Sequence, residues 1–454
     1  MKRLLFSLCA GAVGCALGLQ FPATAIAESK VTILHSFAGP PGDGTEPLAG
    51  LIDVNGTLYG TTIYGGATII CGSGGCGTVF SVNPTTGAER MVYSFCSRQS
   101  CTDGWEPQAG LIDVKGTLYG TTGNGGANPA KKCRFDYMDS CGTVFSFNPT
   151  TGAETVLHSF TSYRKDGSEP VAGLIDVRGT LYGTTLSGGS YTKNCGYGPN
   201  GYPLGCGTVF ALAPKTGADR LLHSFPNNDT DGNDPVAGLV EVDGILYGTT
   251  LTGGRNQGCS PFLGNGCGTV FSIDPKTGDE TVLYSFCSRK TCADGEWPYA
   301  GLVDVSGTLY GTMWNGGANS NSLLCGDGGG AYGCGTVFSL NPTTGEEAVV
   351  YSFCSQKKCV DGDAPKAGLI AVNGILYGTT IAGGVYGAGT VFSLDPGSGK
   401  ETVLHSFGRG CEKKPKCKDG VGPSANLIDV KGTLYGTTSG GGAFEVGTVF
   451  AVTP

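Results

Sequence analysis

The chain has 454 residues, among them 81 glycines and 20 cysteines, and its formal net charge is −8. An acidic chain without a basic cluster is a poor partner for nucleic acid or anionic lipid, so neither is expected as a ligand. Glycine and proline are abundant, but the regular apolar strand patterns described below predict a folded body and argue against disorder.

The N-terminus, residues 1–27, is typical of a secretory signal peptide. Lys2 and Arg3 form its basic start, the apolar run extends from Leu4 to Leu19, and Ala25-Ile26-Ala27 is a small-x-small cleavage site. We therefore expect the mature chain to be secreted or periplasmic.

A lipoprotein cysteine at Cys15 is an alternative, although Ala12 fits that motif poorly. No later apolar run approaches the roughly 18 residues that a membrane span requires, so no span is expected.

A Leu-Tyr-Gly-Thr frame organises the rest of the chain. It occurs seven times, at intervals of 58 to 67 residues, and its tyrosines are Tyr59, Tyr119, Tyr182, Tyr247, Tyr310, Tyr377 and Tyr435. Almost the whole chain is thus one unit repeated seven times, and such a repeat determines the fold class.

The first complete unit predicts four strands. Gly50–Val54 is a short strand, Asn55-Gly56 a two-residue turn that requires positive φ, and Thr57–Thr62 the returning strand. Gly77–Val82 and Glu89–Phe95 are the third and fourth strands, and a variable loop follows both the second and the fourth strand. Four short strands bounded by glycine and proline turns are typical of a propeller blade.

The two ends of the repeat array are complementary. Val31–Phe37 has the sequence of a fourth strand and precedes any first strand, whereas the last unit stops after its third strand. We expect the N-terminal strand to complete the seventh blade and close the ring, which hides both sheet edges. The prediction is an all-β, seven-bladed β-propeller of four-stranded blades, one domain over residues 28–454, and a monomer.

The frames Leu-Tyr-Gly-Thr-Thr-x-x-Gly-Gly and Gly-Thr-Val-Phe resemble the GloVer-type tandem repeat of exported bacterial proteins. The di-glycine after the second strand also resembles kelch blades. The resemblance covers residues 31–454 and implies a secreted or surface propeller, but it implies no activity that could be assigned to particular residues.

The cysteines support an exported protein. After residue 27, 18 cysteines remain, in nine close pairs. Five pairs fall in second-to-third loops, namely Cys71/Cys76, Cys133/Cys141, Cys195/Cys206, Cys259/Cys267 and Cys325/Cys334. Four fall in fourth-to-first loops, namely Cys96/Cys101, Cys287/Cys292, Cys354/Cys359 and Cys411/Cys417. Local disulfides are expected. The alternative of thiolate metal sites lacks Cys-x-x-Cys-like spacing, and no metal or cofactor is expected.

The histidines argue against His-dependent catalysis. All four, His35, His158, His223 and His405, occupy one repeat position, where the other copies have tyrosine. A structural role is expected for them, which leaves no histidine for a catalytic triad or a metal centre.

Two sets of carboxylates follow the repeat. The first strand of six blades carries Asp53, Asp113, Asp176, Glu241, Asp304 and Asp429. These could form a cation ring or, as their recurrence favours, accept hydrogen bonds from the adjacent turn. A second set begins each Asp-Gly-x-x-Pro motif and is interpreted as loop-turn formers: Asp43, Asp103, Asp166, Asp231, Asp294, Asp361 and Asp419.

Residues outside the repeat frame are the candidate ligand-binding residues. Because strands alternate in direction, both kinds of variable loop emerge on one face, where binding is expected. Trp105, Trp297 and Trp314 lie there, the first two beside Glu106 and Glu296. An aromatic plane next to a carboxylate suits a sugar ring, and the alternative is that each tryptophan caps its blade.

The second-blade loop also departs from the frame, with Arg134 and Tyr137 as candidates at the mouth of the channel. Recognition of an extracellular polymer or protein, with a glycan as one possibility, is the favoured function. The alternatives are a polysaccharide lyase or hydrolase with its site on the same face, and a structural or adhesive surface protein. The regular repeat and the absence of a non-repeat histidine favour a non-enzymatic protein.

Overall fold

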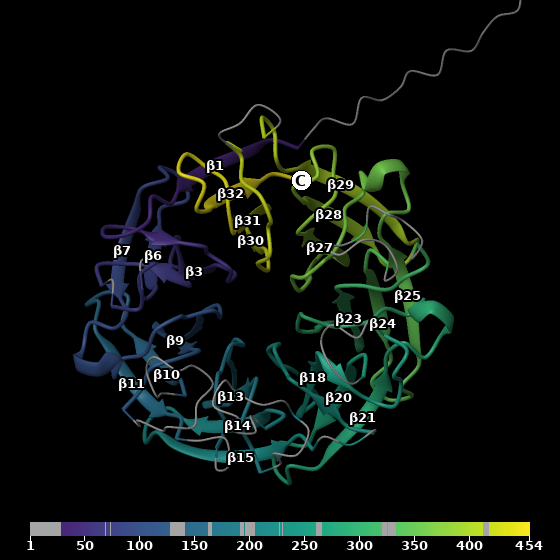
Figure 1. Ribbon diagram of the computed structural model, residues 1–454, viewed down its shortest axis with the longest axis horizontal. Coiled ribbons are helices and arrows are strands. Elements are labelled where there is room, and N and C mark those ends of the chain that lie inside the picture. Colours follow the sequence, from purple (N-terminus) through teal and green to yellow (C-terminus); the bar gives the residue numbers. More distant parts are fainter. Residues whose placement is uncertain are drawn as a thin grey trace, which may run out of the picture.

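The computed structural model describes residues 29–454, except 69, 73, 128–140, 162–165, 191–194, 196–204, 227, 229, 260–265, 320–324, 326–332 and 412–416. The predicted signal peptide and the candidates Arg134 and Tyr137 lie outside the described residues. The described part forms seven four-stranded antiparallel sheets arranged in a ring (Figure 1), which confirms the predicted propeller.

The strands follow the repeat closely. The first and innermost strands are β3 (Ile52–Val54), β8 (Ile112–Val114), β12 (Ile175–Val177), β17 (Val240–Val242), β22 (Val303–Val305), β26 (Ile370–Val372) and β30 (Ile428–Val430). The second strands are β4 (Thr57–Thr62), β9 (Thr117–Thr122), β13 (Thr180–Thr185), β18 (Ile245–Thr250), β23 (Thr308–Met313), β27 (Ile375–Thr380) and β31 (Thr433–Thr438). The third strands are β6 (Thr78–Val82), β10 (Thr143–Phe147), β14 (Thr208–Ala213), β20 (Thr269–Ile273), β24 (Thr336–Leu340), β28 (Thr390–Asp395) and β32 (Thr448–Val452). The fourth strands are β7 (Glu89–Ser94), β11 (Glu154–Ser159), β15 (Ala218–Ser224), β21 (Glu280–Ser285), β25 (Glu347–Ser352), β29 (Lys400–Ser406) and β1 (Val31–Ser36).

The ring closes as predicted. β1 pairs antiparallel with β32, with Val31 opposite Val452 and Ser36 opposite Thr448. The seventh blade therefore has the order β1-β32-β31-β30 and contains both ends of the described chain. Closure in this way removes the free edge that an incomplete blade would expose.

Phenylalanine packing holds neighbouring blades together. The Phe that follows each fourth strand lies edge-to-face against the third-strand Phe of the next blade, for example Phe95 on Phe145 at 5.1 Å between ring centroids. The same contact recurs between all seven pairs of blades, with centroid distances of 5.0 to 5.3 Å. Gly60 of the repeated frame is needed beneath it, because a Cβ there would lie 2.6 Å from the Phe80 ring.

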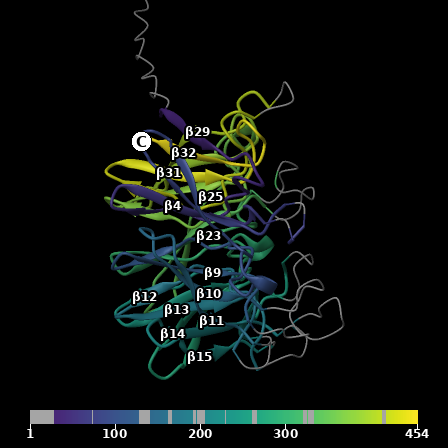
Figure 2. The ribbon, with the colours of Figure 1, turned by 90° about the vertical axis from the view of Figure 1, so that its left-hand side faces the viewer.

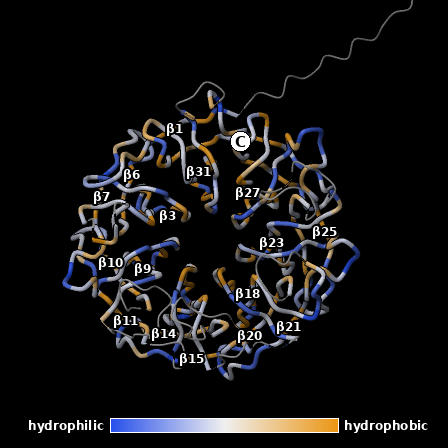
Figure 3. The backbone as a smooth tube through the Cα atoms, in the orientation of Figure 1, coloured by the Kyte–Doolittle hydropathy of each residue, from blue (hydrophilic) through white to orange (hydrophobic). Residues whose placement is uncertain are grey.

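The threonines of the repeated frame add polar links between blades. Thr61 Oγ1 donates to the backbone oxygen of Ala109 in the next blade at 2.9 Å, and Thr437 Oγ1 closes the ring by donating to Ala49. All seven blades make this bond. The glycine and the threonine of the Leu-Tyr-Gly-Thr frame therefore both serve the contact between neighbouring blades. Figure 3 shows hydrophobic stretches running through the blades.

The two variable loops are tied to each other by short elements that the sequence did not predict. Two-stranded ribbons join β2 (Gly44–Thr45) to β5 (Tyr64–Gly65) and β16 (Gly232–Asn233) to β19 (Thr252–Gly253). Three 3-10 turns, η1 (Gln99–Cys101), η2 (Lys290–Cys292) and η3 (Lys357–Cys359), lie in fourth-to-first loops. These turns project from one side of the disc in Figure 2. Within the described part of the chain, no helix combines the length and apolar character of a membrane span.

Eight of the predicted disulfides are formed: Cys71–Cys76, Cys96–Cys101, Cys195–Cys206, Cys259–Cys267, Cys287–Cys292, Cys325–Cys334, Cys354–Cys359 and Cys411–Cys417. Disulfides at this density are typical of an oxidising compartment, extracellular or periplasmic.

The ninth predicted pair, Cys133 with Cys141, is described at one end only. Cys141 is fully buried, packs in the same apolar cluster as Val144 and Phe160, and is disulfide-bonded. Its predicted partner Cys133 lies outside the described residues. The pairing of Cys141 with Cys133 therefore stays a prediction.

Candidate functional site

The first-strand carboxylates stabilise turns. The backbone N–H of Gly116 donates to Asp113 at 2.7 Å, and that of Gly307 donates to Asp304 at 2.9 Å. The equivalent bonds reach Glu241 and Asp429. For these four residues the structure confirms turn hydrogen bonding, the second of the two alternatives considered for this set.

The histidines and their tyrosine counterparts also have a structural partner. Each places a ring nitrogen or hydroxyl beside the Asp of the following Asp-Gly-x-x-Pro motif, as with His35 Nε2 at 3.1 Å from Asp43 and the Tyr284 hydroxyl donating to Asp294 at 2.9 Å. All seven copies make this contact. The Asp residues thus anchor their loops to the fourth strand, in addition to forming turns.

A further acid approaches most of these contacts from the fourth strand of the next blade. Burial, the largest cause, raises the pKa of Glu154 to about 7 although Arg98 Nη2 lies 2.7 Å from it. Burial followed by the charge of Asp231 raises the pKa of Glu280 to about 8. We call each of these sites a junction. A junction consists of the His or Tyr of one fourth strand, the Asp of the following Asp-Gly-x-x-Pro motif and, where present, the acid from the fourth strand of the next blade. The junctions lie at the rim of the disc, away from the channel.

The predicted tryptophan sites are less open than a stacking platform requires. Trp105 and Trp297 are only 9 % and 3 % exposed, so the structure favours the blade-capping alternative for these two. Trp314 is partly exposed and lies 6.0 Å from Trp297 between ring centroids.

The acids beside them are engaged or enclosed. Asn124 donates to Glu106 at 2.7 Å, and burial raises the pKa of Glu106 despite this bond. Glu296 is 1 % exposed and lies beside the sulfurs of Cys259 and Cys267. The structure therefore brings Trp297 and Trp314 together but leaves Trp105, Glu106 and Glu296 apart from any shared open surface.

A cavity of about 790 Å³ occupies the central channel, and the seven chain segments that lead into the first strands line it. The residue after the proline of each Asp-Gly-x-x-Pro motif contributes a side chain to its wall. These residues are Leu48, Gln108, Val171, Val236, Tyr299, Lys366 and Ser424. Tyr299 and Lys366, on adjacent blades 5 and 6, differ from the rest in being aromatic and cationic.

Tyr299, Trp314 and Lys366 form one cluster. The Lys366 Nζ lies 4.5 Å from the centroid of the Tyr299 ring and 5.9 Å from that of Trp314, and the two rings meet edge-to-face at 5.2 Å. Cation–π attraction holds an ammonium in this position. Burial lowers the pKa of Lys366, and no ion pair to it occurs among the described residues.

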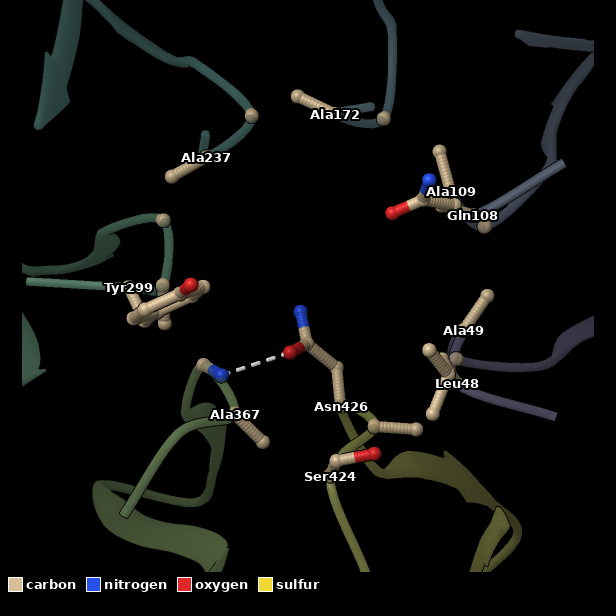
Figure 4. A pocket seen from close by; sticks show the side chains of 18 of the residues that line it. Leu48, Ala49, Gln108, Ala109, Ala172, Ala237, Tyr299, Ala367, Ser424 and Asn426 are labelled. Atoms are coloured by element: carbon tan, nitrogen blue, oxygen red, sulfur yellow. Dashed lines mark hydrogen bonds between the residues drawn. The ribbon is translucent and has the colours of Figure 1, made fainter. Parts of the chain in front are cut away.

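Asn426 places an amide in the same channel. The other six blades have glycine at this position, where the backbones of neighbouring blades approach closely. A Cβ on Gly50 would lie 3.0 Å from the backbone oxygen of Asn426. The N–H of Gly368 donates to Asn426 Oδ1 at 2.7 Å, which directs the Nδ2 group toward the open channel (Figure 4). The Ser424 hydroxyl, also in the cavity wall, is buried and has no hydrogen-bond partner among the described residues.

Sequence reasoning did not find Tyr299, Lys366, Ser424 or Asn426. The signal was present in the repeat, because an alignment of the seven copies shows Tyr and Lys only once each after the motif proline, and Asn once where glycine is the rule. The sequence alone does not show that these positions face the channel.

Two solved structures are similar to this chain at low sequence identity. The extracellular domain of a hybrid two-component system protein from B. thetaiotaomicron superposes with a TM-score of 0.50 and 8 % identity, over 91 % of this chain and 39 % of that one. An oligogalacturonate lyase from Vibrio parahaemolyticus gives a TM-score of 0.45 and 9 % identity over 94 % of both chains. Among curated proteins, none matches the sequence significantly.

The repeat itself is recognised along almost the whole chain. The family described as the Gloeobacter/Verrucomicrobia repeat matches residues 18–197, 142–325 and 324–454. These three matches include every blade of the ring and correspond to the tandem repeat that the sequence frames predicted. The chain therefore belongs to the Gloeobacter/Verrucomicrobia repeat family.

Proposed function

We propose that this protein is an extracellular or periplasmic binding protein that recognises a saccharide at the central channel. The observation that carries the proposal is the contact of Tyr299 with Lys366 on one wall of a cavity of about 790 Å³, with Trp314 packed edge-to-face against the Tyr299 ring. Specific small-ligand sites are concave, have volumes of roughly 300–1,000 Å³, and combine aromatic surface with a few polar groups. Aromatic faces suit the apolar face of a sugar ring, and amides and hydroxyls suit its hydroxyl groups.

The loops favour access from blades 6 and 7. Their second-to-third loops hold four residues each, compared with 10 to 17 in the other blades. These short loops expose Val385, Tyr386 and Phe444, which are 66 %, 41 % and 55 % exposed. A polymer that enters the channel over the short loops of blades 6 and 7 would contact Lys366 and Asn426.

A binding function fits the polar groups of the channel better than hydrolysis by a carboxylate pair. The carboxylates that line the cavity in the described part of the chain are Glu169 and Asp429, from blades 3 and 7. Asp429 accepts a hydrogen bond from the turn at Gly432, and Glu169 accepts one from Ser187. Arg134 and Tyr137 stay predictions for the same face.

The test uses the oxidised mature chain, residues 28–454, and a panel of immobilised and soluble polysaccharides. Tyr299→Val introduces the residue that blades 3 and 4 carry at this position, so the fold should be retained. We expect retention on at least one glycan and a loss of up to about tenfold in affinity for Tyr299→Val, because a stacked ring contributes about 0.5–1.5 kcal/mol.

Leu48→Val, at the same repeat position on blade 1, is the matched control and should bind normally. Retention that survives Tyr299→Val would place binding elsewhere. Soluble oligosaccharide products would identify an enzyme instead, and neither retention nor products would favour the structural or adhesive alternative.

A further inference from the structure

The acidic residues around the channel are unevenly distributed. The residue before the proline of each Asp-Gly-x-x-Pro motif is acidic in four consecutive copies, Glu46, Glu106, Glu169 and Asp234. In the next three copies, which lead into blades 5, 6 and 7, it is Trp297, Ala364 and Gly422. Of these four acids Glu169 lines the cavity, and blades 5 to 7 have no acid at this repeat position. The other carboxylate of the cavity wall in the described part of the chain, Asp429 of blade 7, accepts a hydrogen bond from the backbone N–H of Gly432.

Hydrogen-bond donors gather on the side that lacks these acids. Lys366, Ser424 and Asn426 all line the cavity and come from the adjacent blades 6 and 7. The Lys366 ammonium has no ion pair among the described residues, and the Ser424 hydroxyl has no hydrogen-bond partner there. Asn426 uses its oxygen for Gly368 and keeps its NH₂ group toward the channel.

Two acids on blades 5 and 6 do not neutralise this group. Glu296 and Asp363 occupy the preceding position in the motif and are 1 % and 3 % exposed. Neither lines the cavity, and Glu296 lies beside the Cys259–Cys267 sulfurs. A partly buried ammonium facing a cavity is stabilised when an anion accepts its hydrogen bonds, because burial of an unpaired charge is costly.

We propose that the saccharide bound in the channel is acidic and that its carboxylate is held by Lys366, Ser424 and Asn426. This inference rests on the proposed function. A uronic acid unit would place its ring against Tyr299 and direct its carboxylate toward blades 6 and 7, away from Glu169. A carboxylate offers two oxygens with several acceptor positions, so it can accept from more than one of the donors in this cavity wall.

The test compares sugars that differ only at C6: cello-oligosaccharides and their C6-oxidised glucuronate counterparts, with the galacto and manno epimers as further pairs. Binding is measured by calorimetry on the full mature chain. We expect the uronate of the recognised epimer to bind about tenfold or more tightly than its neutral partner, with a preference that weakens as salt is added.

Each variant carries the residue that another blade has at the same repeat position, so it should retain the fold while it removes one donor. Lys366→Val carries the residue of blades 3 and 4, and Asn426→Gly carries that of the other six blades. Both should lower the affinity for the uronate more than that for the neutral sugar, so that Lys366→Val abolishes the preference for the uronate and Asn426→Gly reduces it several-fold. Lys276→Met, at an exposed turn, is the control and should have no effect.

The outcomes separate the two proposals. Equal binding of neutral and acidic sugars in all variants would overturn the acidic ligand and leave saccharide recognition standing. No binding of any sugar would overturn both. An acidic peptide that binds as tightly as the uronate, and loses affinity in Lys366→Val, would assign the donors to a protein partner and would also overturn the acidic saccharide.

Discussion

Two kinds of junction between blades perform the same task in different ways. In three of them a tyrosine donates to the Asp of the Asp-Gly-x-x-Pro motif, and in four a histidine takes its place. The tyrosine junctions belong to the loops that also carry a disulfide, a 3-10 turn and an additional serine. The comparison shows that the Asp is the constant element and that its donors vary with the loop.

The tyrosine junctions are the more completely hydrogen-bonded. At the junction of Tyr284, the fully buried Asp294 accepts from the tyrosine hydroxyl, from the backbone and hydroxyl of Ser288, and from the backbone of Arg289. At the junction of His223, Asp231 accepts from Gly232 and has the imidazole nitrogen 3.4 Å away.

The junctions also differ in whether an arginine compensates the charge of the glutamate from the next blade. Arg98 and Arg289 pair with Glu154 and Glu347 at two of the tyrosine junctions. No arginine pairs with Glu89, Glu280 or Glu401 among the described residues. Charge compensation is therefore an addition made by particular loops, whereas the hydrogen bond to Asp belongs to the repeat.

The largest expected difference between the two kinds of junction follows from removal of the Asp. Asp294→Ala leaves several donors without an acceptor, at about 1–3 kcal/mol for a buried unsatisfied group, so we expect a total loss of about 3 kcal/mol. Asp231→Ala should cost about 1 kcal/mol, because it removes fewer bonds. Denaturant melts of the oxidised chain measure both, and equal losses would mean that the junctions do not differ in strength.

Removal of an arginine should have a smaller, pH-dependent effect. Arg289→Met leaves Glu347 buried without its partner, and because Arg289 is about half exposed we expect a loss of about 1–2 kcal/mol at pH 8. Burial raises the pKa of Glu347 to about 7, so at pH 5 this carboxyl is protonated and the loss should be much reduced.

The double variant Arg289→Met with Glu347→Gln is the control and should remove the pH dependence. Thermal melts at pH 5 and pH 8 provide the measurement. The same loss at both pH values would contradict the assignment of a buried ion pair to this junction.

The smallest effect is expected from the glutamates that lack an arginine. Burial raises the pKa of Glu280 and of Glu401 from the usual 4.5 to about 8. Between about pH 4.5 and about pH 8 these two carboxyls are therefore protonated in the folded chain but ionised in the unfolded chain. The free energy of unfolding should fall as pH rises through this range. Glu280→Gln should reduce the decrease in melting temperature between pH 5 and pH 8 by about 1–2 °C. An unchanged decrease would show that Glu280 does not titrate in this range.

The sequence alone determined the architecture, because the same pattern of strands and turns occurs seven times. The Leu-Tyr-Gly-Thr frame encodes a strand, a glycine beneath the Phe80 ring and a threonine that bonds the next blade. The closing strand followed from a surplus fourth strand at one end and a missing one at the other. The cysteine pairs followed from their close spacing, since a short chain segment keeps both thiols within reach.

The tertiary structure decided which loop residues meet. Trp105 and Trp297 lie in the predicted loops, but only packing shows that they are buried. Tyr299 and Lys366 are 67 residues apart in sequence and form one contact because adjacent blades bring the same repeat position to the channel wall. Sequence patterns describe one blade at a time, whereas the channel is made by all seven, and its chemistry depends on the few positions at which the copies differ.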